Sequence, residues 1–259
     1  MLGEQFSFIE HFSRLRAEAS RSYDGTMAVN ANVAAVGHLI AAPARAAMLD
    51  ALFDGGQWPV SDLARVARIA PSTASEHLEL LRRGGLVTVA QDGRYRRYRL
   101  AGPEVAEALE VLGALAPPLA ARGLTESTRN EALQRGRTCY DHLAGRLGVA
   151  LSDALVARGW LRAASDGFAP TPAGTDAFAR IAIDIESLRR ARRPVTRSCL
   201  DWSERQPHLA GGLGAALLAR LDAERGIERI NGSRAVLLRT PGRELLAAVG
   251  VELDGAAAR

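Results

Sequence analysis

The chain has 259 residues, of which 47% are hydrophobic and 24% are charged, a composition typical of a folded protein with one or two domains. No apolar run reaches the roughly 18 to 20 residues that a membrane span needs, and the charged N-terminus lacks the apolar core of a secretion signal. Two cysteines are too few for a disulfide scaffold. We therefore expect a cytoplasmic protein with no membrane partner.

The net charge of +4 is concentrated in one segment, residues 61–100. That segment holds eight arginines against four acidic residues, whereas the rest of the chain holds 25 residues of each sign. A basic segment in an otherwise neutral chain predicts binding to a polyanion, most simply nucleic acid.

The first third of the chain predicts an arm followed by helices. Residues 1–29 mix small, charged and aromatic types and are expected to form an N-terminal arm. A helical pattern then runs over residues 33–52, and Pro43 divides it into two helices because proline removes an amide donor and clashes with the preceding turn.

Two short helices joined by a tight turn come next. The first is predicted over residues 60–67 with Ser61 as its N-cap, and the second begins at residue 72 or 73 and ends at Arg83. Two strand-like segments, 86–90 and 95–100, flank the hairpin signal Asp92-Gly93. This order predicts a winged helix-turn-helix.

A last helix, predicted over residues 104–115 with Pro103 at its first position, completes a domain over residues 30–116. Ala116-Pro117-Pro118 then reads as a linker, so we place a domain boundary there. The fold class predicted for the whole chain is mainly α with small β-hairpin wings, with a C-terminal duplicated winged-helix-like region over residues 117–259.

A winged helix-turn-helix places the N-terminal residues of its second helix against base edges in the major groove, while basic residues contact phosphates. A winged helix can instead serve only protein contacts, but the concentrated positive charge argues for DNA. Because side chains alternate along a strand, only one of Arg96 and Arg97 should face DNA fully. The predicted DNA-binding residues are Ser72, Thr73, Ser75, Glu76, Arg82 and Arg83 of the helix and Arg94, Tyr95, Arg96 and Arg97 of the hairpin.

Several motifs of this domain resemble the ArsR-type family of bacterial repressors. The matching segments are Ala42-Pro43-x-Arg45, Ser61-Asp62-Leu63-Ala64, the run from Pro71 to Leu78, Leu81-Arg82-x-x-Gly85-Leu86-Val87 and Asp92-Gly93-Arg94. The resemblance covers residues 30–116. It implies a homodimer built on the first and last helices of this domain, which binds double-stranded operator DNA and is released by an effector.

The chain departs from that family at the place where its best-known metal sensors bind metal. Those sensors carry a cysteine pair in the helix that begins here near Val60, whereas the first cysteine of this chain is Cys139. We therefore expect any sensing to lie elsewhere.

The second half of the chain repeats itself. Residues 137–148 reappear as residues 197–214 with a six-residue insertion, and each copy continues into an apolar helix, a glycine, a hairpin signal and another helix. This order predicts two winged-helix-like pseudo-repeats, about 125–185 and 186–250, joined by a charged helix over residues 176–193.

Both cysteines of the chain occupy equivalent positions in this repeat. A cysteine and a histidine three residues apart lie on one helical face and can bind one ion. Two copies meeting across a pseudo-two-fold axis would then form a tetrahedral Cys2His2 set for a zinc-like divalent metal ion, with the aspartates orienting the ligands. The candidate metal or redox residues are Cys139, Asp141 and His142 of the first copy and Cys199, Asp201 and His208 of the second.

The same residues leave other readings open. The two thiols could pair on oxidation as a redox switch. Alternatively, the cysteines pack, the aspartates cap helices, the histidines are satisfied core residues, and Arg137 and Arg197 form ion pairs with the two aspartates. A third candidate is a pocket for an anionic aromatic effector, lined by Tyr140, Trp160, Phe168, Phe178, Trp202 and nearby arginines, although a core role for these aromatics is the simpler interpretation.

These observations predict a DNA-binding transcriptional regulator. We expect a dimeric repressor released by a metal ion, a thiol oxidant or a small molecule sensed in the C-terminal domain. The alternatives are a non-sensing DNA-binding or architectural protein, or an enzyme that uses the Cys-His pairs. The sequence has no Gly-rich phosphate loop, paired catalytic carboxylates or nucleophile elbow, so we expect the chain not to be an enzyme.

Overall fold

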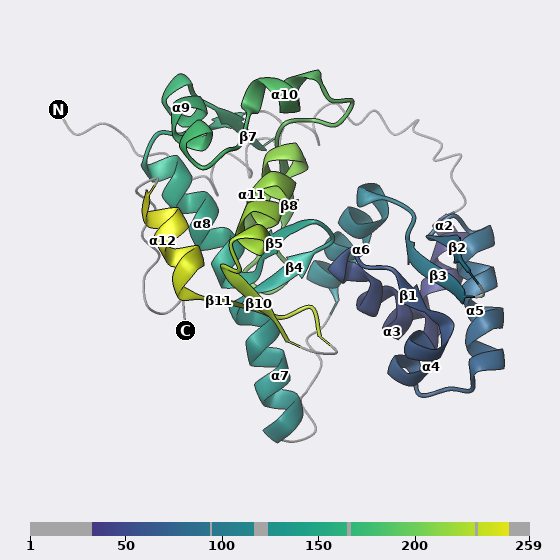
Figure 1. Cartoon of the computed structure of the whole chain (residues 1–259). Helices are drawn as coiled ribbons and strands as arrows, with labels where there is room; N and C mark the ends of the chain where they lie inside the picture. The colour runs from purple at the N-terminus through teal and green to yellow at the C-terminus, as the bar shows by residue number, and fades with distance from the viewer. Residues whose placement is uncertain (1–32, 94, 117–123, 165–166, 231–232, 249–259) are drawn as a thin grey trace. The chain divides into compact units, whose positions relative to one another are not determined.

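The computed structural model describes residues 33–93, 95–116, 124–164, 167–230 and 233–248 (Figure 1). The chain divides into two units, Met1–His38 and Leu39–Arg259. The predicted N-terminal arm, residues 1–29, lies outside the described residues. Within the described ranges no single helix is both long and apolar enough to cross a membrane, and only Val33–Ile40 and Pro43–Asp54, taken together as a bent pair, meet that test.

The N-terminal elements follow the predicted order of a winged helix-turn-helix. Proline stands in the first turn of α3, α5 and α6, where its missing amide donor costs no helical hydrogen bond. The elements are α2 (Val33–Ile40), α3 (Pro43–Ala51), the 3-10 helix η1 (Leu52–Asp54), β1 (Trp58–Pro59), α4 (Val60–Ala67), α5 (Pro71–Arg83), β2 (Val87–Asp92), β3 (Tyr95–Leu100) and α6 (Pro103–Leu115).

One local prediction in this region was wrong. Helix α4 begins at Val60, its N-cap is Pro59, and Ser61 lies inside the first turn without being the cap. The cause is a strand that the sequence pattern missed, because β1 has only two residues. Trp58 pairs with Tyr98 and Pro59 with Arg97, which gives the wing sheet the order β1-β3-β2.

The hydrophobic core of the winged helix-turn-helix lies where its helices meet the wing. Leu63 of α4, Leu78 and Leu81 of α5, and Leu100 of β3 are completely buried, together with Met48 of α3. The turn between α4 and α5 is fixed by Arg68, whose left-handed backbone (φ 55°) ends α4. The core therefore holds α5 in a defined orientation against the β2–β3 hairpin.

The C-terminal half contains the predicted duplication. A hairpin, a long helix, a second hairpin and a short helix occur in this order twice, as β4-β5-α8-β6-β7-α9 and as β8-β9-α11-β10-β11-α12 (Figure 1). The bounds are α7 (Leu124–Arg135), β4 (Arg137–Cys139), β5 (His142–Ala144), α8 (Gly145–Ala157), β6 (Leu161–Ala164), β7 (Gly167–Pro170), α9 (Pro172–Arg180), α10 (Ile185–Arg190), β8 (Arg197–Leu200), β9 (Pro207–Ala210), α11 (Gly211–Ala223), β10 (Ile227–Arg229), β11 (Val236–Leu238) and α12 (Thr240–Ala248).

The charged helix predicted over residues 176–193 is not continuous. Helix α9 ends at Arg180, Ala182 has a positive φ of 59°, and α10 begins after Asp184. The Asp184 carboxylate accepts hydrogen bonds from the backbone of Glu186 and Ser187, which makes it the N-cap of a separate helix.

The two copies share a close approach between hairpin and helix. A side chain at Gly148 would place its Cβ 2.5 Å from the Leu143 carbonyl oxygen, and one at Gly214 would place it 2.7 Å from the Leu209 carbonyl oxygen. Glycine lets α8 and α11 lie directly against β5 and β9 at equivalent positions. The two hairpins are thereby held by matching contacts.

The C-terminal half has a core of its own, in which Leu147, Phe178 and Leu213 are almost completely buried. The two hairpins that carry the cysteines contribute Leu143 and Leu209 to this core, but the cysteines themselves do not belong to it. Cys139 and Cys199 belong to the same buried cluster as the core of the winged helix-turn-helix. Residues 117–123 lie outside the described residues, and the division at residue 116 stays a prediction.

Candidate nucleic-acid interface and candidate metal centre

The predicted recognition helix α5 exposes the side chains that were expected to meet DNA. Ser72, Ser75 and Glu76 are exposed and Thr73 is half-buried, while Leu78 and Leu81 face the core. The Ser75 hydroxyl donates to the Pro71 carbonyl oxygen (2.9 Å), which orients it along the helix. Small hydrogen-bonding groups thus line the outer face of the N-terminal half of α5.

The two arginines at the end of α5 share one carboxylate. Arg82 and Arg83 each donate to Glu79 at 2.8 Å, and these two bonds lower the pKa of Glu79 to about 2. Glu79 is therefore ionised at neutral pH and offsets half of the positive charge at this end of the helix.

The wing places its arginines on two sides. Arg96 is exposed, whereas Arg97 is half-buried and pairs with Asp92 at 2.7 Å. Arg94 lies outside the described residues, and only the backbone of Tyr95 is described. A groove between α5 and the wing is lined by Ser75, Glu79, Arg82, Arg83, Val89, Arg96 and Tyr98. The groove brings Arg96 together with the arginines of α5, and DNA contact by these residues stays a prediction.

The cysteines and histidines lie on two hairpins, so the prediction that they share a helical face was wrong. Cys139 of β4 pairs across the hairpin with His142 of β5, and Cys199 of β8 pairs with His208 of β9. Tyr140 has a left-handed backbone (φ 60°), which closes the first hairpin through a two-residue turn. Side chains opposite each other on antiparallel strands point to the same face.

The two hairpins bring Cys139, His142, Cys199 and His208, here called the Cys2His2 cluster, to one point. One ligand atom from each residue lies within 4.8 Å of the others, and all four residues are buried. The two Sγ atoms are 3.9 Å apart, and the two Nε2 atoms are 3.1 Å apart.

Each histidine turns its other nitrogen towards the aspartate of its own copy. His142 Nδ1 lies 3.4 Å from Asp141 Oδ1, and His208 Nδ1 lies 3.8 Å from Asp201 Oδ2. Both carboxylates are backed by an arginine, since Arg193 donates to Asp141 and Arg137 donates to Asp201 (2.9 Å).

The arginine pairing considered from the sequence was wrong. Arg137 pairs with Asp201 of the other copy rather than with Asp141, and Arg197 pairs with Glu107 of α6 at 3.0 Å. Asp201 also accepts from the backbone of Gly145 at 2.6 Å. The two copies are therefore tied together by a carboxylate of one and a hairpin end of the other.

The electrostatic environment shifts the pKa values of the cluster residues and of Asp141 in different directions. The Cys199 thiol and burial raise the pKa of Cys139 well above its usual value. Burial, followed by the nearby His142, lowers the pKa of His208 well below its usual value. Burial opposes the ionisation of Asp141, but hydrogen bonds from His142 and Arg193 lower its pKa to about 2. The Asp141 carboxylate is thus charged, the Cys139 thiol and the His208 imidazole favour their neutral forms, and Cys139 and Asp141 raise the pKa of His142 to about 9 against the effect of burial.

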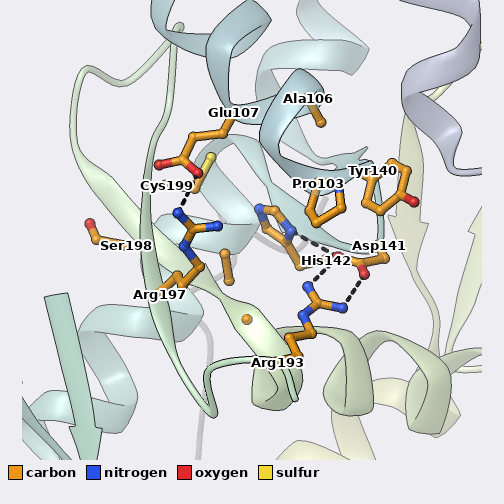
Figure 2. Close-up of a pocket in the computed structure, with 12 residues that line it drawn as sticks. Pro103, Ala106, Glu107, Tyr140, Asp141, His142, Arg193, Arg197, Ser198 and Cys199 are labelled. Carbon is orange, nitrogen blue, oxygen red and sulfur yellow. Dashed lines mark hydrogen bonds and ion pairs between the residues drawn. The ribbon is translucent and has the colours of Figure 1, made fainter. Parts of the chain in front are cut away.

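A small cavity of about 20 Å³ leads to the cluster, and His142 and Cys199 are among its lining residues (Figure 2). Figure 2 shows two ion pairs beside it, Arg193 with Asp141 and Arg197 with Glu107. The cavity has room for about one water-sized species.

Sequence reasoning missed a buried ionic network that joins this region to α6. Glu110 is only 1% exposed and accepts from Arg234 at 2.9 Å, and Arg137 lies 3.5 Å from its other oxygen. Arg234 also pairs with Asp50 of α3 at 3.2 Å. The one available signal was that Glu110 falls in line with Ala106 and Ala114 on the small-residue face of α6.

The aromatic residues considered as an effector pocket serve mainly as core. Phe168 and Phe178 are 4% and 0% exposed within the C-terminal core. The guanidinium of Arg137 lies over the ring of Trp202, with 4.7 Å between the guanidinium carbon and the ring centre. Packing accounts for these side chains.

The chain is similar to known regulators over both halves. A helix-turn-helix domain family matches residues 40–90. An HTH-type transcriptional regulator of Bacillus subtilis, YdfF, is 41% identical over 215 residues, which cover 83% of this chain and 95% of the relative. A match of that length extends beyond the winged helix-turn-helix into the duplicated half.

Shorter similarities involve the DNA-binding unit alone. CmtR, an HTH-type transcriptional regulator of Mycobacterium tuberculosis, is 40% identical over 77 residues, 30% of this chain and 64% of the relative. A solved homodimeric winged helix-turn-helix domain of Mb0332 from Mycobacterium bovis, described as a possible ArsR-family regulator, is 26% identical. It covers 44% of this chain and 89% of that structure with a TM-score of 0.31. From its motifs, its fold and the long match to YdfF, the chain belongs to the ArsR-type family of winged helix-turn-helix transcriptional regulators.

Proposed function

We propose that this regulator is a dimeric repressor that binds operator DNA through α5 and the wing and is released by an effector sensed at the Cys2His2 cluster. The observation that carries the proposal is the convergence of four buried metal- or redox-competent side chains within 4.8 Å. The minimal DNA-binding unit does not need such a cluster, so a sensing role gives the duplicated half a purpose.

Direct contacts supply a route from the cluster to the DNA-binding unit. The Tyr140 amide, between the two cluster residues of the first hairpin, donates to the Phe53 carbonyl oxygen at 2.6 Å. Arg137, two residues before Cys139, lies beside Glu110 of α6. A change in the spacing of the two hairpins would therefore shift η1 and α6. These contacts provide a physical route for allosteric coupling between the cluster and DNA binding.

The exposed face of α6 supports dimerisation. Val111, Leu112 and Leu115 are 41%, 43% and 79% exposed, although α6 buries Ala106 and Glu110 on its other side. Apolar side chains gathered on one helix face gain free energy by packing against a second copy. A dimer also presents two recognition helices to two half-sites, as a partly palindromic operator requires.

Leu115→Glu is expected to convert the dimer into monomers, because a carboxylate would be buried in an apolar interface. Sedimentation analysis at several protein concentrations measures this directly. Val156→Glu on α8, where the parent valine is 37% exposed, is the matched control and should leave the assembly unchanged. A parent chain that is monomeric at every concentration would refute this part of the proposal.

The regulatory step is tested with an operator selected from random duplex DNA by the reduced, metal-free protein. Adding Zn²⁺ or a thiol-specific oxidant is expected to weaken operator binding about 5- to 150-fold, the range of typical allosteric coupling. Fluorescence anisotropy of a labelled duplex reports the affinity. If neither addition changes it, the cluster is not the effector site and the architectural alternative is favoured.

A thiol-based response is the second candidate, because the chain's two cysteines are neighbours, although their sulfurs would have to approach from 3.9 Å to about 2.05 Å. Oxidation would join Cys139 to Cys199 directly. The two classes of effector differ in what they need from the histidines, because a disulfide needs only the sulfurs whereas a metal ion uses all four ligands.

A further inference from the structure

We propose that the Cys2His2 cluster is a tetrahedral binding site for one thiophilic divalent metal ion of the zinc class, held between the two copies of the repeat. This inference deepens the proposed function and rests on it only for the regulatory consequence. It concerns the C-terminal half, away from the helix near Val60 where the sequence lacks cysteine.

The sulfur–sulfur and nitrogen–nitrogen separations fit such an ion, and the sulfur–nitrogen pairs, which lie within 4.8 Å, would close to about 3.6 Å around it. Zinc bonds of roughly 2.3 Å to sulfur and 2.0 to 2.1 Å to nitrogen in a tetrahedron place two sulfurs about 3.8 Å apart and two nitrogens about 3.3 Å apart. The observed separations are 3.9 Å for the sulfurs and 3.1 Å for the Nε2 atoms. A disulfide, by contrast, needs the sulfurs to approach to about 2.05 Å.

The histidines separate the metal interpretation from a redox pair. Both present Nε2 to the centre and Nδ1 to a carboxylate, which is the arrangement that fixes the tautomer of a metal-bound imidazole. Among the described groups, His208 Nδ1 is a buried nitrogen without a hydrogen-bond partner, and Asp201 is the acceptor that faces it. A disulfide switch explains none of these features.

The chemistry of binding balances without a redox partner. The Cys139 and Cys199 thiols release their protons to solvent, and two thiolates with two neutral imidazoles bind M²⁺, so the occupied centre carries no net charge. Neutrality suits a fully buried site. The cavity lined by His142 and Cys199, beside the Asp141–Arg193 ion pair, supplies the entry path.

Titration of the reduced full-length protein with Co²⁺ tests the site. We expect one ion per chain, the strong visible absorption of tetrahedral Co²⁺ and a thiolate-to-cobalt charge-transfer band, with displacement by Zn²⁺. The chain has only two cysteines, so this band can arise only from Cys139 and Cys199. Octahedral Co²⁺ without charge transfer, or no binding, would overturn the proposal.

Variants locate the ligands and the positioning residues. Cys199→Ser should remove most of the charge-transfer band and His208→Gln should weaken binding, whereas His77→Gln in α5 should change neither. Asp141→Asn, at a partly exposed position, should keep the tetrahedral spectrum while weakening affinity about 10- to 100-fold. Circular dichroism of each variant reports folding, and an Asp141→Asn protein that binds as the parent does contradicts the orienting role.

The outcomes for site and function are distinguishable. Tetrahedral binding with unchanged operator affinity supports the metal site and refutes its role as the effector site. Operator release by the oxidant, without tetrahedral binding of Co²⁺ or Zn²⁺, supports the proposed function and overturns the metal site.

Discussion

Arg137→Met is expected to destabilise the folded chain by about 3–5 kcal/mol, the usual cost of removing one partner from a buried ion pair. Arg137 is 0% exposed and donates to Asp201 at 2.9 Å, with Glu110 at 3.5 Å. Methionine fills a similar volume but leaves both carboxylates buried with less positive charge beside them. Denaturant unfolding of the metal-free protein measures the change as a lower midpoint at constant slope.

The loss of stability expected for Arg137→Met depends on the charge of Asp201, which is ionised at neutral pH. Burial opposes its ionisation, but the Arg137 charge and the hydrogen bonds from Ser203 and the Glu204 backbone hold the pKa of Asp201 below its usual range. The stabilisation is therefore present above the pKa of an unfolded aspartate, and it is lost as the pH falls towards the lower folded value. The penalty for Arg137→Met should accordingly shrink at acidic pH.

Two further variants separate the network from a general effect of losing an arginine. Arg135 lies two residues before Arg137 and pairs with Glu131 at 3.0 Å near the surface. Arg135→Met breaks this pair and should cost no more than about 1 kcal/mol. Arg137→Met combined with Asp201→Asn should cost less than the sum of the single changes, because the carboxylate left behind is then neutral. Equal losses for Arg135→Met and Arg137→Met would contradict a stabilising role for the buried pair.

The winged helix-turn-helix was predictable because its signals are local. Pro43, Gly93 and Pro103 each restrict or permit one backbone conformation, and the elements begin and end near them. The strand β1 was missed because a two-residue strand has no periodicity, and it exists only through pairing with β3. The cap of α4 was misplaced for the same reason.

The cluster shows where spacing alone is ambiguous. A separation of three residues between Cys139 and His142 fits one helical face and equally fits a two-residue hairpin. The six-residue insertion in the second copy was the available discriminator, since extra residues would rotate His208 away from Cys199 on a helix but merely lengthen a hairpin loop. The residue set was predicted correctly as a group that meets, while the element carrying it was not.

The buried network was beyond sequence reasoning for a different reason. Glu110 and Arg234 are 124 residues apart, and no local pattern links them. Glu110 follows Glu104 and Glu107 on α6, so the sequence pattern favours a third solvent-exposed carboxylate at this position. Only the tertiary contacts of Arg137 and Arg234 with Glu110 explain why a carboxylate occupies a buried position there.

The second large effect is expected on DNA binding. Arg96→Glu should weaken operator affinity at least about tenfold and reduce the slope of log affinity against log salt by about 1 per subunit, because one phosphate contact is lost. Arg96 is exposed beside the groove that contains Arg82 and Arg83, and among the described residues no carboxylate lies within ion-pair distance of it. Anisotropy titrations at several salt concentrations give both quantities.

Glu79→Gln provides a test of opposite sign on the same surface. Glu79 pairs with both Arg82 and Arg83 and is ionised at neutral pH, so its neutralisation frees positive charge facing the groove. Affinity for random duplex DNA should rise and the salt slope should steepen, whereas Arg158→Glu, on the exposed end of α8, should change neither. If Arg96→Glu and Glu79→Gln leave the slope unaltered while Arg158→Glu lowers it, the polyanion contacts lie in the duplicated half and not on α5 and the wing.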